Sequence, residues 1–183
     1  MNLWNTVERR NVTLSNNERG NNLMQVRDFM IYNVYTAKPT TTVKELISIF
    51  ESKRIGGVPV VDNRGNLVGM VSDGDVVRFL SPTKEKIHVY HYLTYFEIEE
   101  SVEDVLRDKM DTPISEIMVK KNIKTLSPAD DFESAIRLIS QHHFKKLPVI
   151  NGAGRVVGVV SRGDIIHNLS KKIVETEELL SIQ

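Results

Sequence analysis

The residues of this chain that could do chemistry lie in one short pattern that occurs twice. Gly-x-Val-Ser-x-Gly-Asp runs from Gly69 to Asp75 and again from Gly158 to Asp164. In both copies an apolar run precedes the serine and a short helix is predicted after it, so the serine should stand at a helix N-terminus. Free backbone N–H groups and a partial positive charge at that position attract phosphate.

The side chains of the pattern extend this hypothesis. The hydroxyls of Ser72 and Ser161 would add a donor, and the carboxylates of Asp75 and Asp164 could accept hydrogen bonds from both hydroxyls of a ribose. Glycine between serine and aspartate lets a ligand approach the backbone closely. Phosphate and ribose together indicate a nucleotide.

The same residues also have a purely structural interpretation. A serine at the N-cap and an aspartate three residues later form a capping box, in which the two groups satisfy backbone N–H groups at the start of a helix. Taken alone, the pattern favours this interpretation, because many helices begin in this way.

The pattern belongs to a longer internal repeat. When residues 34–80 are moved forward by 89 positions, they align with residues 123–169, and 13 of the 47 columns are identical. Two copies of one supersecondary unit, each too small to bury its own apolar face well, are expected to pack against each other.

Each copy predicts the same order of elements, β-α-β-β-α. In the first copy an extended segment stops at Pro39, a helix follows, and a glycine-containing turn joins the apolar strands 58–61 and 67–71 before a short helix at 73–80. The second copy repeats this order with strands at 147–150 and 156–160 and a short helix at 162–169. A mixed α/β (α+β) fold is therefore predicted, with the repeats packed as a pseudo-two-fold pair.

The sequence predicts five segments. The opening segments VRDFM and ISEIM begin the repeats, and the stretch between the repeats has an aromatic part (86–96) and an acidic, helix-prone part (97–110), so we expect a helical insertion. The segments are a polar N-terminal arm (1–24), repeat one (25–80), the helical insertion (81–113), repeat two (114–170) and a C-terminal helical tail (171–183).

The composition of the chain limits the kinds of function that are expected. The chain of 183 residues has 24 basic and 24 acidic residues, so no overall field favours nucleic acid or an anionic membrane. It has no cysteine, which removes disulfides, thiolate catalysis and cysteine-based zinc sites. Because no signal peptide and no stretch of about 18 apolar residues is present, a soluble, cytoplasmic protein is expected.

Other polar residues give weaker hypotheses. His88 and His91 would share a helical face three residues apart, with Glu97, Glu99 and Glu100 nearby, but no third metal ligand is fixed by the spacing, and no metal site is predicted. His142 and His143 could contact phosphate if protonated. Since no base near either serine could activate its hydroxyl, no catalytic residues are predicted and the chain is not expected to be an enzyme.

Two β-α-β-β-α units that each end in an apolar strand, Ser-x-x-Asp and a short helix resemble a tandem CBS-domain protein, named after the regulatory domain pair of cystathionine β-synthase. The resemblance covers 26–80 and 114–170. It implies two clefts between the packed repeats, which bind adenosine-containing ligands such as AMP, ADP, ATP or S-adenosylmethionine. By this resemblance Asp75 and Asp164 would hold ribose hydroxyls, Ser72 and Ser161 would approach phosphate, and Thr36 and Thr125 would lie near the adenine.

Basic residues before the second strand commonly meet the phosphates in this family, and here the copies differ. Repeat two has Lys145 and Lys146 where repeat one has Gly56 and Gly57, and it has Arg162 where repeat one has Asp73, which would repel a phosphate. We therefore expect one dominant anion site around Ser161, Asp164, Lys145 and Lys146, and a weaker or different site around Ser72 and Asp75. The structural alternative for the two lysines is a solvated strand entry.

The expected function is a non-enzymatic regulatory module that binds an adenine nucleotide and signals to an unknown protein partner. The resemblance further implies a homodimer whose modules meet through the short helices. The ligand is not a cofactor, and neither nucleic acid nor a membrane is an expected partner. Two alternatives stay open: a sensor of cyclic di-AMP or S-adenosylmethionine, and a structural dimerisation or docking module with empty clefts.

Overall fold

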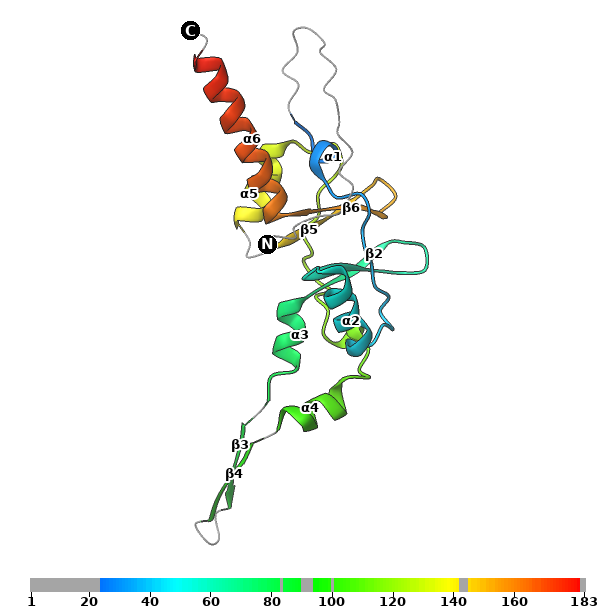
Figure 1. Cartoon of the computed structure of the whole chain (residues 1–183). Coiled ribbons are helices and arrows are strands. Elements are labelled where there is room, and N and C mark those ends of the chain that lie inside the picture. Colours follow the sequence, from blue (N-terminus) through cyan, green and yellow to red (C-terminus); the bar gives the residue numbers. More distant parts are fainter. Residues whose placement is uncertain (1–23, 83, 90–93, 100, 142–144, 182–183) are drawn as a thin grey trace.

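The computed structural model describes residues 24–82, 84–89, 94–99, 101–141 and 145–181 (Figure 1). The polar arm predicted at 1–24 lies almost wholly outside these residues. Repeat one contains α1 (Val26–Phe29), α2 (Val43–Lys53), β1 (Gly57–Val61), β2 (Leu67–Ser72) and α3 (Asp73–Phe79). Repeat two contains the short 3₁₀ helix η1 (Ile114–Glu116), α5 (Phe132–Gln141), β5 (Lys146–Ile150), β6 (Val156–Ser161) and α6 (Arg162–Ser181).

The mixed α/β class and the two repeats are confirmed. β1 pairs with β2 and β5 with β6, each as a small antiparallel sheet of two strands. The first strand predicted for each repeat is reduced to a single parallel bridge, Ala37 to Val60 and Leu126 to Val149. The predicted β-α-β-β-α order is therefore present, with a much shorter first strand than expected.

The segments that open the repeats cross over to the other repeat. In the backbone, Val26 N donates to Asp130 O at 2.8 Å, and Ile31 exchanges hydrogen bonds with Val159 at 2.9 and 3.1 Å. Ile114 N donates to Thr41 O at 2.8 Å in the same way. Each repeat thus pairs its backbone with the opening segment of the other.

The same exchange builds the two hydrophobic cores. Val26 and Met30, at the start of repeat one, lie in the core of repeat two with Leu126, Phe132, Ala135, Ile139, Leu147, Val149, Val160 and Ile165. Ile114, at the start of repeat two, lies in the core of repeat one with Ala37, Val43, Leu46, Val58, Val60, Val71 and Val76. Neither core is complete without a segment from the other repeat, so the pair folds as one unit.

The first glycine of each motif makes room for this exchange. A Cβ atom built on Gly69 would lie 2.5 Å from the sulfur of Met118, and one built on Gly158 would lie 2.5 Å from the sulfur of Met30. Both distances are too short for a carbon and a sulfur atom. The methionine that ends each opening segment therefore packs directly on the backbone of the opposite repeat.

The hairpin turns of the two repeats also meet. Leu67 N donates to Gly154 O at 3.3 Å, and Val156 N donates to Gly65 O at 3.2 Å. Gly65 and Gly154 both have left-handed φ values, 84° and 76°, which glycine adopts without strain. Because these glycines occupy the same column of the repeat, the contact follows the predicted pseudo-two-fold relation.

The insertion differs from the helical segment that was expected. Its first part is a β-hairpin of β3 (Lys84–Val89) and β4 (Thr94–Glu99), and only its second part is helical, as α4 (Val102–Lys109). Figure 1 shows the hairpin projecting away from the two repeats. The physical reason is in the sequence: apolar and polar residues alternate over 87–89 and 96–99, and β-branched and aromatic residues, which favour strands, are frequent in both segments.

The strand at 84–89 also contradicts the helix on which the predicted pair of His88 and His91 depended. His88 is in β3, so it cannot share a helical face with a residue three positions later, and His91 lies outside the described residues, as do Glu100, His142 and His143. Among the residues that the structure places, no group of three or more His, Asp or Glu side chains could hold a metal ion.

The last helix is longer than predicted. The short helix of repeat two and the tail are one continuous helix, α6, because no proline or glycine interrupts the chain after Gly163. No helix in the described ranges is both long and apolar enough to cross a bilayer.

Candidate functional site

Both strand-to-helix junctions form the predicted capping box. Ser72 donates to Asp75 Oδ2 through its backbone N–H at 2.8 Å and through its hydroxyl at 2.6 Å. Ser161 makes the same two bonds to Asp164 Oδ2, at 2.8 and 2.7 Å, and Asp164 N donates back to Ser161 Oγ at 3.2 Å. The structural interpretation of the motif is therefore correct for both copies.

These bonds limit what each serine can offer to a ligand. Each hydroxyl proton points at the neighbouring carboxylate, so a phosphate at either junction would meet backbone N–H groups more readily than the hydroxyl. The carboxylates keep acceptor capacity, because a carboxylate has about four lone-pair positions and each uses only some of them here. A ribose could still bind to either aspartate.

The two carboxylates have different surroundings. Asp75 Oδ1 forms an ion pair with Arg78, one turn further along α3. Repeat two has His167 in the equivalent column. The sequence analysis did not identify Arg78, although its spacing of three residues from Asp75 is typical of an ion pair on a helix.

Lys146 reaches from repeat two to repeat one. It begins β5, where it is paired with Ser161, and its Nζ donates to the carbonyl oxygen of Gly57 at 3.3 Å. Burial lowers the pKa of Lys146 below its usual value, and the negative charges of Asp73 and Asp164 oppose this change. The ammonium group therefore loses its proton at a lower pH than an exposed lysine would, although two carboxylates lie near it.

Lys145 also reaches across the two repeats. Its Nζ is 3.5 Å from Asp73 Oδ1, and both side chains are about half exposed. Lys145 was expected at the site of repeat two, and Asp73 was expected to repel phosphate in repeat one, but the structure places them side by side. We call Asp73, Lys145, Lys146 and Asp164 the inter-repeat charge cluster.

The remaining predicted residues lie around this cluster or apart from it. Arg162 is exposed at the first turn of α6, and its backbone N–H donates to Lys145 O at 3.1 Å. Thr36 and Thr125 precede the bridge residues Ala37 and Leu126, and neither hydroxyl bonds to another residue that the structure describes. Ser161, Asp164, Lys145, Lys146 and Arg162 are thus brought together, while the threonines stay at the edges of the sheets.

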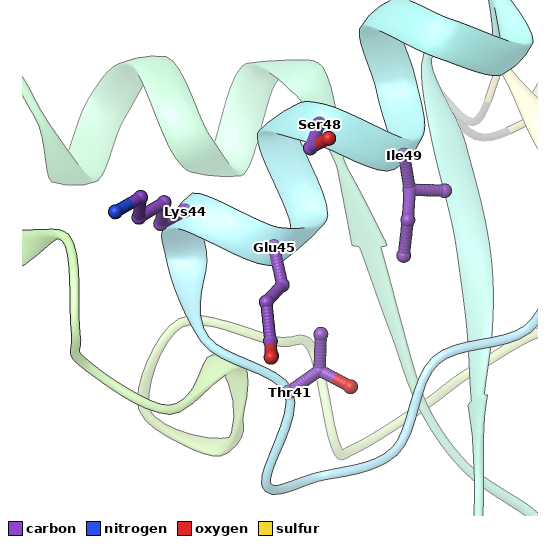
Figure 2. Close-up of a pocket in the computed structure, with 5 residues that line it drawn as sticks. All are labelled: Thr41, Lys44, Glu45, Ser48 and Ile49. Atoms are coloured by element: carbon purple, nitrogen blue, oxygen red, sulfur yellow. The ribbon is translucent and has the colours of Figure 1, made fainter.

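Two hollows on the described surface lie elsewhere. One of about 590 Å³ lies beside α2 and is lined by Thr41, Lys44, Glu45, Ser48 and Ile49 (Figure 2). Another, of about 260 Å³, lies beside α6 and is lined by Leu169, Lys172, Ile173 and Glu177. Neither contains a residue of the two motifs. The chemistry of the side chains, and not the depth of a hollow, therefore identifies the inter-repeat charge cluster as the candidate site.

Comparison with known families agrees with the fold. The CBS domain matches residues 26–82 and 114–171, which together make up more than half of the chain. An uncharacterised protein of Methanocaldococcus jannaschii is 27% identical over 157 residues, covering 80% of this chain and 92% of that protein. Inosine-5'-monophosphate dehydrogenase of Aquifex aeolicus is 30% identical over 137 residues, but the match spans only 23% of that enzyme.

Solved structures show the same architecture. The CBS-domain protein CBSX2 of Arabidopsis thaliana, solved in complex with AMP, is similar with a TM-score of 0.62 and 23% identity, covering 80% of this chain and 96% of that one. A CBS domain pair in complex with 5'-methylthioadenosine and S-adenosyl-L-methionine is similar with a TM-score of 0.62 and 21% identity, covering 82% and 98%.

Proposed function

The chain belongs to the CBS-domain family, and from this premise we propose that it is a regulatory module that binds an adenosine-containing nucleotide at the inter-repeat charge cluster. The observation that carries the proposal is that both lysines lie at the start of β5 beside the Ser161–Asp164 junction: Lys146 is paired with Ser161, and Lys145 O accepts from Arg162 N. These groups match the phosphate and the ribose of one nucleotide.

Each group has a proposed role. Asp164 accepts from the ribose hydroxyls, because its carboxylate has acceptor capacity beyond its bonds to Ser161. Lys145 and Lys146, with the first N–H groups of α6 and Arg162, attract the phosphate. Repeat one has Gly56 and Gly57 in place of the two lysines, so we propose that its junction, where Asp75 is paired with Arg78, is the weaker site. Thr36 and Thr125 are proposed to lie near the adenine.

Similarity to structures that hold AMP, 5'-methylthioadenosine or S-adenosyl-L-methionine supports an adenosine-containing ligand. The match to the dehydrogenase spans less than a quarter of that enzyme, so its activity is not transferred to this chain. We propose that this module is cytoplasmic, that it is not an enzyme and that it acts on a protein partner.

The proposed regulation follows from the position of the lysines. Both belong to repeat two but contact repeat one, at Asp73 and at the carbonyl of Gly57. A phosphate that draws these lysines toward Ser161 would weaken both contacts and change how the repeats pack. A ligand shifts such an equilibrium only by its difference in affinity for the two arrangements, which is the quantity a partner would detect.

The test is a binding titration of the purified chain with AMP, ADP, ATP, S-adenosylmethionine and cyclic di-AMP. We expect saturable calorimetric binding of at least one adenine mononucleotide and a matching rise in melting temperature, because a ligand that binds the folded state must stabilise it. Tighter binding of cyclic di-AMP would favour the dinucleotide sensor. An unchanged melting temperature with every compound would refute the proposal and favour a structural docking module.

We also propose that the chain forms a homodimer through the helices that follow the two motifs. Val77 of α3 and Ile166 of α6 occupy the same column of the repeat, and both are more than 60% exposed. Ile173 lies two turns after Ile166 on the same face of α6 and is also exposed. Apolar side chains repeated on both halves suit a symmetric contact with a second copy.

Replacing Val77 and Ile166 together by glutamate should convert the dimer to a monomer, because four carboxylates would be buried in a symmetric contact without partners. Light scattering after gel filtration should show the mass fall from twice that of the chain to that of one chain. Val102→Glu, on the exposed face of α4, is the control and should leave the mass unchanged. A wild-type chain that is already monomeric would exclude the dimer.

A further inference from the structure

We infer that Asp73 sets how many phosphate groups the bound nucleotide can carry, so that the chain selects a monophosphate over a triphosphate. This inference rests on the proposed function, since it concerns the ligand of the same site. It is drawn from the placement of an acidic residue of repeat one among the lysines of repeat two.

The charges of the cluster are balanced. Lys145 is 3.5 Å from Asp73, and the charges of both Asp73 and Asp164 act on Lys146. Two ammonium groups therefore face two carboxylates, and the formal charges of these four groups sum to zero. Of the other groups proposed to meet the phosphate, only Arg162 adds a formal charge to this sum. Two lysines without carboxylates would attract each phosphate group of the ligand. A cluster with balanced charges still contacts the first phosphate, but it attracts a second or third phosphate only weakly.

The position of Asp73 is fixed by its own repeat. Its Oδ1 accepts from Gly74 N at 2.7 Å, and its backbone N–H donates to Gly56 O at 3.2 Å. A Cβ atom on Gly56 would lie 2.6 Å from Asp73 Oδ2, so the carboxylate occupies space that any other residue at position 56 would fill. Gly56 and Asp73 together place a negative charge where repeat two carries Lys145 and Arg162.

This charge penalises a longer phosphate chain. A ligand whose first phosphate meets Lys145 and Lys146 must extend any second and third phosphate past a group that lies within 4 Å of Lys145. Two like charges at such distances repel, and the repulsion grows with each added phosphate. AMP should therefore bind more tightly than ATP, with ADP between them.

The experiment is calorimetric titration of the full chain with AMP and with ATP, without divalent cations, in wild type and Asp73→Asn. Asparagine keeps the acceptor for Gly74 N–H and removes only the charge. We expect wild type to prefer AMP, and Asp73→Asn to lower the ratio of the ATP to the AMP dissociation constant by about tenfold, mainly through tighter ATP binding. Asp108→Asn, on the exposed face of α4, makes the same charge change as a control and should leave the ratio unchanged.

A second variant moves the ratio in the opposite direction. Lys145→Met leaves Asp73 without its cation, so it should weaken ATP more than AMP. If wild type binds AMP but the ratio is the same in Asp73→Asn, or if Asp108→Asn changes it equally, the role of Asp73 is refuted while the proposed function stands. If wild type binds neither nucleotide, the proposed function fails, and this inference fails with it.

Discussion

Asp164→Ala should weaken nucleotide binding by at least about 100-fold, because hydrogen bonds to a charged group contribute about 1.5–3 kcal/mol each and a ribose would form two of them. The variant also loses the capping box of α6, which should lower the free energy of unfolding by about 1 kcal/mol. Calorimetric titration measures the first effect, and chemical denaturation without ligand measures the second.

Asp75→Ala is the matched control for this variant, because it removes the same residue of the same motif in repeat one. Its carboxylate is already paired with Arg78, so we expect a loss of less than about threefold in affinity. Equal losses in the two variants would show that both junctions bind ligand alike. If Asp164→Ala bound nucleotide as tightly as wild type, the junction of repeat two would only cap its helix.

Ile114→Ala should lower the free energy of unfolding by about 2–5 kcal/mol, the usual cost of removing a large aliphatic side chain from a core. Ile114 is fully buried, although it lies in a short opening segment, because it completes the core of repeat one. Urea denaturation followed by circular dichroism should show an earlier transition that remains single, since neither core is complete without the other repeat.

Leu106→Ala tests whether this cost comes from the exchanged contact. Leu106 is 42% exposed on α4, so the same kind of truncation there should cost less than about 1 kcal/mol. If Ile114→Ala were equally mild, or if it split the transition into two steps, the exchange of opening segments would not hold the two repeats together.

Local physics explains why much of the fold could be predicted. Strands and helices follow from the spacing of apolar residues over a few positions, and the capping boxes at Ser72 and Ser161 follow from residues three apart. The short alternating runs 87–89 and 96–99, with their β-branched and aromatic residues, indicated strands in the segment that was expected to be helical. The ion pair between Arg78 and Asp75 could also have been predicted, because the two residues are three positions apart on a helix.

The duplication, the α/β class, the two serine–aspartate junctions and the balance of charge follow from the amino-acid sequence alone, because each depends on residue types and short spacings. The packing of the two repeats sets which repeat each opening segment completes, and it brings Lys145 to Asp73 and Lys146 to the carbonyl of Gly57. Those contacts join residues 72 and 89 positions apart, and their geometry depends on how two similar units pack, which no local pattern encodes.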